Sequence, residues 1–136
     1  MFLFDTDVLS ELTRPKPNVG LVRKLLTCAP GLRFASEMTR YELRYGAVLH
    51  PRGDALWARI ESEILPRCAW LPIDSIVSIR TADMSARVRL AGQTIDWADL
   101  VIAATASVHD LIVVTRSVRH FERIPGLQVE NWFPVE

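Results

Sequence analysis

Short apolar runs alternate along the chain with stretches in which apolar residues recur every three or four positions. Apolar runs over residues 1–4, 32–36, 69–73 and 111–115 predict strands, and residues 127–132 predict a last, short one. The run over 111–115 contains Ile, two Val and Thr, which are residues that favour strands. Each predicted strand is followed by polar residues, as expected where a buried strand ends.

Helical spacing fills the intervals between these runs. A short helix carries Val8, Leu9 and Leu12 before Pro15 ends it, and Asn18 can cap a second helix with Val22, Leu25 and Leu26 on one face. Further helices are predicted over 37–50, 54–65, 75–91 and 97–109, the last rich in alanine. Strands that alternate with helices indicate an α/β domain with a central, mainly parallel sheet flanked by helices.

Length and composition exclude several other classes of protein. The 136 residues suit a single domain over 1–136, because two domains would each have too small a core. Sixteen basic and sixteen acidic residues cancel, so bulk charge does not indicate nucleic-acid binding. No apolar run approaches the roughly 20 residues that span a bilayer, and Asp5 interrupts the first run too early for a signal peptide. Two cysteines without a CxxC motif indicate neither a disulfide scaffold nor a zinc site, so we expect a cytoplasmic protein.

Acidic and hydroxyl side chains follow the predicted strands at the points where these end. Asp5 follows the first strand, Glu42 lies early in the helix after the second, and Ser117 follows the strand over 111–115. Asp99 lies at the start of the helix over 97–109, close to Asp96. Because parallel strands end at one edge of a sheet, these side chains can converge there. Carboxylates that converge repel one another unless a cation such as Mg²⁺ neutralises them. The pattern predicts metal-assisted hydrolysis of a phosphodiester.

Each of these residues also has a purely structural interpretation. The segment 5–7 can cap the first helix, and Thr39 with Glu42 matches the T-x-x-E capping box. Asp96 and Asp99 stand at a helix start, where the helix dipole favours negative charge. These alternatives remain open at the level of single residues.

Taken together and in order, the motifs resemble those of PIN-domain ribonucleases, and most closely those of VapC-type toxins of the FitB-like branch. The resemblance rests on MFLFDTDVLSEL at residues 1–12, SEMT at 36–39 with Glu42, IDWADLVIAA at 95–104, VTRSVRHF at 114–121 and IPGL at 124–127. It spans nearly the whole chain.

That resemblance implies a three-layer PIN-like fold and a metal-dependent endoribonuclease that acts as the toxin of a toxin–antitoxin pair. By the same resemblance, Asp5 and Asp99 would bind Mg²⁺ or Mn²⁺, and Glu42 would bind metal or orient water. The implied partners are an RNA substrate, a cognate VapB-like antitoxin and a second copy in a homodimer, within a larger toxin–antitoxin assembly in some relatives.

The chain departs from the family pattern at two positions. Asp7 stands where the family usually has Asn, and Ser117 where it usually has Asn or Asp. We expect Ser117 to weaken a second metal-binding position without abolishing activity, with Asp7 or Asp96 supplying the missing charge.

Two arginines lie within the segment VTRSVRHF at residues 114–121. Arg116 and Arg119 are candidates for contacts with RNA phosphates.

Two other functions compete with the ribonuclease. The sequence Asp5-Thr6-Asp7 has the D-x-D form of haloacid-dehalogenase-type phosphotransferases. Such enzymes also need a lysine far along the chain, and here both lysines precede residue 25. The other rival is a PIN-like protein-binding module with impaired catalysis, which the serine at the fourth motif supports.

Overall fold

A parallel sheet forms the centre of the molecule. The structure is a computed structural model that describes residues 1–134. The strands are β1 (Phe2–Phe4), β2 (Arg33–Ser36), β3 (Ala69–Leu71), β4 (Ile112–Val114) and β5 (Val129–Glu130). Their order is β3-β2-β1-β4-β5, and every neighbouring pair is parallel. The predicted α/β class with a parallel sheet is confirmed.

Helices connect consecutive strands and cover both faces of the sheet. They are α1 (Thr6–Glu11), α2 (Val19–Thr27), α3 (Glu37–Leu49), α4 (Gly53–Arg59), α5 (Ser75–Leu90), α6 (Trp97–Val108) and α7 (Val118–Glu122). Side chains fix two of the predicted starts, since Asn18 accepts a hydrogen bond from the Leu21 amide and Asp74 accepts one from the Val77 amide. Among the described residues, no helix combines the length and the apolar character that a membrane span requires.

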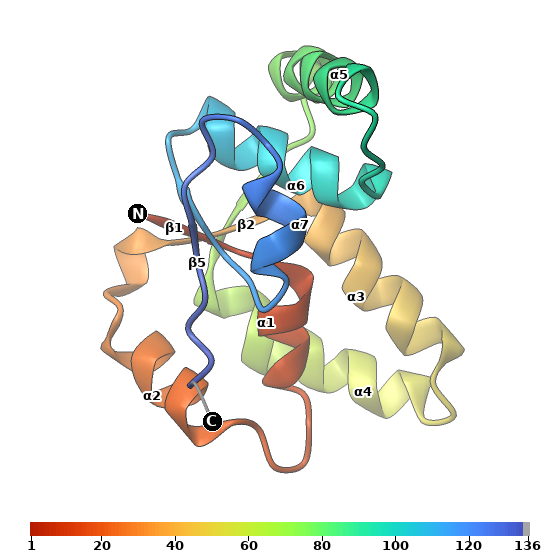
Figure 1. Cartoon of the computed structure of the whole chain (residues 1–136). Helices are drawn as coiled ribbons and strands as arrows, with labels where there is room; N and C mark the ends of the chain where they lie inside the picture. Colours follow the sequence, from red (N-terminus) through yellow and green to blue (C-terminus); the bar gives the residue numbers. More distant parts are fainter. Residues whose placement is uncertain (135–136) are drawn as a thin grey trace.

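Two hydrophobic cores lie on opposite faces of the sheet. Successive side chains of a strand point to opposite faces, so Leu3 packs in the core with α5, α6 and α7, whereas Phe4 packs in the core with α1 to α4. Figure 1 shows α5 and α6 on one side of the sheet and α2 and α4 on the other. The result is the three-layer arrangement that the resemblance implied.

Helix α6 is buried over most of its length. Seven consecutive residues, 100–106, are buried, and three of them are alanines. Small side chains allow the helix backbone to approach the sheet closely, which is why the alanine-rich sequence is found there. The tight packing fixes the position of Asp99 in the first turn of α6.

Three details differ from the sequence predictions. The predicted apolar face of the second helix is buried only in part, because Leu25 is buried and Leu26 is 58% exposed, while Leu21, outside that face, is buried. The predicted helix over 54–65 is divided into α4 and a π-helical turn, η2 (Ile60–Ile64), that continues into the short 3₁₀ turn η3 (Leu65–Arg67). Helix α7 was not predicted, because five residues are too few to show helical periodicity.

Candidate active site

The candidate site lies at the edge of the sheet where β1, β2 and β4 end. Asp5 directly follows β1 and is only 6% exposed. Its Oδ1 accepts a hydrogen bond from the Thr6 amide (2.7 Å), and its Oδ2 accepts one from the Thr115 hydroxyl (2.8 Å). Asp5 is therefore both the N-cap of α1 and a member of the site, so the two interpretations of this residue are compatible.

The loop after β4 faces a second carboxylate. Asp7 accepts a hydrogen bond from the Arg116 amide (3.2 Å to Oδ2), and the hydroxyls of Thr115 and Ser117 lie 3.3 and 3.4 Å from the same oxygen. The Ser117 amide in turn donates to the Thr115 hydroxyl (2.9 Å). Segment 115–117 thus presents hydrogen-bond donors to both Asp5 and Asp7.

Glu42 reaches the site from α3. Its Oε1 accepts a hydrogen bond from the Thr6 hydroxyl (2.6 Å), which also lies 3.1 Å from the Thr39 hydroxyl. The capping-box interpretation of Thr39 and Glu42 is wrong, because α3 begins after Ser36, whose hydroxyl accepts from the Met38 amide. Glu42 therefore stabilises the contact between α3 and α1 and does not cap its own helix.

Asp99 contributes a further carboxylate from the first turn of α6. Its Oδ2 lies 3.5 Å from Nδ1 of His120 on α7, which is an ion pair when the imidazole is protonated. Asp96 occupies the N-cap position of α6, but its side chain makes no capping hydrogen bond and is exposed. Its carboxylate is free to act electrostatically on its neighbours.

Burial and mutual repulsion raise the pKa values of three of these acids. Burial, with the charge of Asp7, raises the pKa of Asp5 to about 7 from 3.8. Burial also raises the pKa of Glu42, with added repulsion from Asp99, Asp96 and Asp7. The pKa of Asp99 is likewise raised, by burial first and then by Asp96, although His120 opposes the shift. The acids, drawn from three distant parts of the sequence, share one electrostatic environment.

Comparison with known families supports this assignment of the fold. The family described as PIN domain matches residues 2–127. The chain belongs to the PIN domain family.

Individual relatives place this PIN domain near VapC-type proteins, as the sequence motifs indicated. It is 35% identical to VapC ribonuclease Y4jK of Sinorhizobium fredii, over 98% of this chain and 99% of that protein. It is 38% identical to Toxin FitB of Neisseria gonorrhoeae, over 89% of this chain and 91% of that protein. Among solved structures, FitAcB from Neisseria gonorrhoeae matches with a TM-score of 0.90 and 34% identity, covering 99% of this chain and 100% of that one. DNA-bound VapBC from Salmonella typhimurium matches with a TM-score of 0.88 and 30% identity, over 96% and 97% of the two chains.

The donor set of this PIN domain fits a hard divalent cation. Several carboxylates whose pKa values are raised by burial and by one another would be relieved by a positive ion, and oxygen is the ligand atom that Mg²⁺ prefers. In the part of the chain that the structure describes, no three His, Cys, Asp or Glu side chains lie close enough together to hold a metal ion as they stand.

The two candidate arginines have different surroundings. Arg119 is exposed on α7. The guanidinium of Arg116 instead donates to Glu11 Oε1 (3.3 Å) and stacks on the Phe133 ring, 3.8 Å from its centroid. The prediction of a phosphate contact thus suits Arg119 better than Arg116.

The sequence assigned no role in the site to three residues that belong to it. Thr6 and Thr115 hold Glu42 and Asp5 respectively, and His120 contacts Asp99. The first two had a detectable signal, because each lies at the end of a predicted strand on the edge where the acids gather. His120 lies on a helix that the sequence did not predict.

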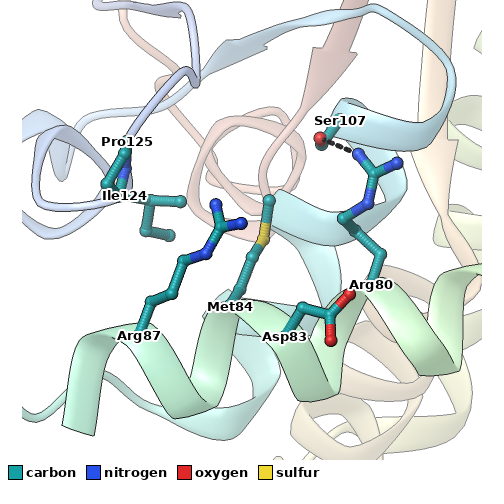
Figure 2. Close-up of a pocket in the computed structure, with 7 residues that line it drawn as sticks. All are labelled: Arg80, Asp83, Met84, Arg87, Ser107, Ile124 and Pro125. Atoms are coloured by element: carbon teal, nitrogen blue, oxygen red, sulfur yellow. Dashed lines mark hydrogen bonds between the residues drawn. The ribbon is translucent and has the colours of Figure 1, made fainter. Parts of the chain in front are cut away.

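A separate cavity of about 360 Å³ lies elsewhere on the molecule, between α5, the carboxyl end of α6 and the loop after α7. Figure 2 shows Arg80 and Arg87 of α5 directed toward this space, with Arg80 donating to the Ser107 hydroxyl (2.6 Å). Ser107 and Asp99 lie eight residues apart on α6, which corresponds to about 12 Å along a helix. This cavity is therefore not part of the acidic site.

Proposed function

We propose that this chain is a metal-dependent endoribonuclease that acts as the toxin of a type II toxin–antitoxin system. The observation that carries the proposal is the convergence of Asp5, Asp7, Glu42 and Asp99 at one edge of the sheet, where burial and mutual repulsion raise the pKa values of three of them. Relatives named as a ribonuclease and a toxin support the same assignment.

Asp5 and Asp99 would hold Mg²⁺ or Mn²⁺, with Glu42 as a third ligand or as the group that orients water. A divalent ion bound there would supply Lewis acidity toward the phosphodiester and lower the pKa of a nearby water. Asp7, Asp96 and Ser117 would act in support, the first two through negative charge and the third through its hydroxyl.

The protein's own side chains would orient the reacting groups. Thr115 and the Thr6 amide hold the two oxygens of Asp5, so that carboxylate has one orientation. Thr6 holds one oxygen of Glu42, which leaves the other to accept a proton from the attacking water. Arg119, exposed beside the site on α7, would contact an RNA phosphate. With a formal net charge of zero, recognition of RNA would depend on shape and local sequence rather than on bulk attraction.

A cleavage assay tests the proposal. We expect RNA cleavage in Mg²⁺ or Mn²⁺ that is lost in Asp5→Ala and Asp99→Ala and retained in Asp83→Ala. Asp83 is the matched control because it is an exposed aspartate on α5 outside the acidic site. Partner binding without cleavage of any RNA in a broad panel would instead identify a protein-binding module.

We also propose a VapB-like antitoxin as partner, seated on an apolar surface of α2. A cavity of about 580 Å³ there is lined by Lys16, Pro17, Val19, Val22, Arg23 and Leu26. The atoms that these side chains present to the cavity are almost all apolar. Val19 and Leu26 are 66% and 58% exposed. An amphipathic antitoxin helix with acidic residues at its edge would bury these apolar groups and pair with Lys16 and Arg23.

We further propose that the protein forms a homodimer in the cytoplasm through an apolar surface of α3. The outward face of α3 carries Tyr41, Tyr45, Val48 and Leu49 at helical spacing, each between 57% and 68% exposed. Tyr41 and Tyr45 stack with ring centroids 6.0 Å apart. An apolar stripe of this kind on a helix is typical of a surface that a second copy covers.

A further inference from the structure

The side chain of Arg116 is held in place by two partners. Its Nη2 donates to Oε1 of Glu11 (3.3 Å), and its guanidinium lies over the Phe133 ring. Glu11 is only 5% exposed, and its other oxygen accepts from the Asn18 amide (3.1 Å). Phe133 is 8% exposed. The Arg116 side chain is 48% exposed, so these two buried partners are what hold its planar guanidinium in one orientation.

The backbone of the same residue belongs to the acidic site. The Arg116 amide donates to Asp7, and the residues on either side provide the hydroxyls of Thr115 and Ser117. All three donors lie within hydrogen-bond distance of Asp7, and the Thr115 hydroxyl also donates to Asp5. Fixing the side chain of Arg116 therefore fixes the segment that orients both carboxylates.

We propose that Arg116 is a positioning residue that sets the affinity of the acidic site for a divalent cation, acting through segment 115–117 and anchored by Glu11 and Phe133. This inference rests on the proposed metal-dependent function and assigns Arg116 a role other than phosphate binding. Groups that orient metal-binding side chains in this way typically change metal affinity about 10- to 100-fold when they are removed.

The positioning role and a phosphate-binding role predict different measurements. A positioning residue changes Mn²⁺ affinity in the absence of RNA and leaves the salt dependence of RNA binding unchanged. A phosphate contact leaves Mn²⁺ affinity unchanged and lowers the slope of that salt dependence by about one. Arg119 is the matched comparison, because it is an exposed arginine three residues along the chain.

The experiment compares Arg116→Met, Arg116→Lys, Glu11→Gln and Arg119→Met. Mn²⁺ affinity is measured by isothermal titration calorimetry without RNA, and RNA binding is measured across a salt series in EDTA. We expect about tenfold weaker Mn²⁺ binding in Arg116→Met and Glu11→Gln, a smaller loss in Arg116→Lys and wild-type affinity in Arg119→Met. In the salt series, Arg119→Met should have the lower slope and Arg116→Met the wild-type slope.

Amide hydrogen exchange tests the anchor without any metal. We expect the amides of Arg116 and Ser117 to exchange at least tenfold faster in Arg116→Met and in Glu11→Gln than in wild type. If Arg116→Met does not fold, Phe133→Leu removes the stacking partner alone and is expected to have the same effect on exchange.

Two results overturn the inference. One is wild-type Mn²⁺ affinity in Arg116→Met combined with a lower salt slope, which would identify a phosphate contact. The other is unchanged exchange of both amides in Arg116→Met and Phe133→Leu. Wild-type protein that neither binds Mn²⁺ nor cleaves RNA would contradict the proposed function and with it the role in metal affinity.

Discussion

Asp5 is both the N-cap of α1 and a carboxylate of the acidic site, and these two roles place opposite demands on its charge. As the N-cap of α1 it must stand close to the Thr6 amide, and this position buries its carboxylate beside Asp7. Burial and that neighbour raise its pKa to about 7. In the free protein, therefore, Asp5 holds a proton over a pH range in which the unfolded chain has already released it.

This shift predicts how the stability of the metal-free protein depends on pH. Between about pH 4 and 7 the folded state binds one proton more than the unfolded state at Asp5, so stability falls as pH rises through this range. We expect Asp5→Asn, which cannot ionise, to be more stable than wild type at pH 7.5 in EDTA by about 4 kcal/mol. The free energy of unfolding from urea titrations measures this difference.

The control for this prediction is the same comparison at acidic pH. At pH 4 Asp5 is protonated in the folded protein and close to half protonated in the unfolded chain, so the advantage of Asp5→Asn should shrink to below about 1 kcal/mol. An advantage of equal size at both pH values would show that its cause is packing rather than charge.

Ser117 allows a second prediction at this scale. Its hydroxyl lies 3.4 Å from Asp7 Oδ2, where an amide or a carboxylate would be a stronger oxygen ligand. We expect Ser117→Asp to bind Mn²⁺ several-fold more tightly than wild type and Ser117→Asn to lie between them, as calorimetry can measure. Unchanged affinity in both variants would show that this position does not contribute to metal binding.

The acids of the site could be predicted from the sequence, but the groups that orient them could not. Asp5, Glu42 and Asp99 follow or face strand ends, and parallel strands bring such positions to one edge whatever the side-chain details. The bond from Thr6 to Glu42 depends on how α1 approaches α3, and the bond between Arg116 and Glu11 joins residues 105 apart. Contacts of this kind depend on register and packing, which a periodic pattern does not encode.

At the scale of elements, strongly periodic segments were predictable and short or interrupted ones were not. Helix α5, 16 residues long, begins at Ser75, where the sequence predicts it. Helix α7 has five residues, and η2 widens the expected helix into a π-helical turn. The predicted apolar face of α2 combines the buried Leu25 with the exposed Leu26, because apolar residues occur on both sides of this helix.

The turn between α3 and α4 depends on the absence of a side chain at Gly53. A Cβ there would collide with the Ala47 carbonyl oxygen, which is backbone and cannot move aside easily. We expect Gly53→Ala to lower the free energy of unfolding by about 1–3 kcal/mol in a urea titration. Gly46 is the control: it lies inside α3 with no described atom within 4 Å of the added Cβ, so Gly46→Ala should raise stability by about 0.5–1 kcal/mol. Equal losses in both variants would contradict the close approach at Gly53.

Helix α2 gives a prediction about the partner. If its apolar surface binds an antitoxin helix, Leu26→Glu should weaken binding of the VapB-like antitoxin at least tenfold, as measured by calorimetry, and leave RNA cleavage unchanged. Thr27→Glu is the matched control, because Thr27 is the exposed neighbour outside the cavity lining. Equal affinity in the two variants would locate the antitoxin elsewhere.

On the scale of the whole molecule, the two cores leave different outer surfaces. The sheet is covered on both faces, and most of the large apolar residues that remain exposed lie on helices. The stripe on α3 is notable because the same helix directs Glu42 toward the acidic site. One helix thus connects a candidate self-association surface with the candidate active site.

Self-association through α3 can be tested with a single charge. In a dimer that buries this stripe, Val48→Glu would place a carboxylate against apolar side chains, which costs several kcal/mol unless it is paired. We expect wild type to sediment at twice 15.4 kDa and Val48→Glu at about one chain mass in analytical ultracentrifugation. Gln93→Glu adds the same charge at an exposed position after α5 and should sediment like wild type. Because Val48 is 63% exposed in the single chain, its replacement should leave the fold of each copy intact. A dimer that persists in Val48→Glu would therefore show that the copies meet through another surface.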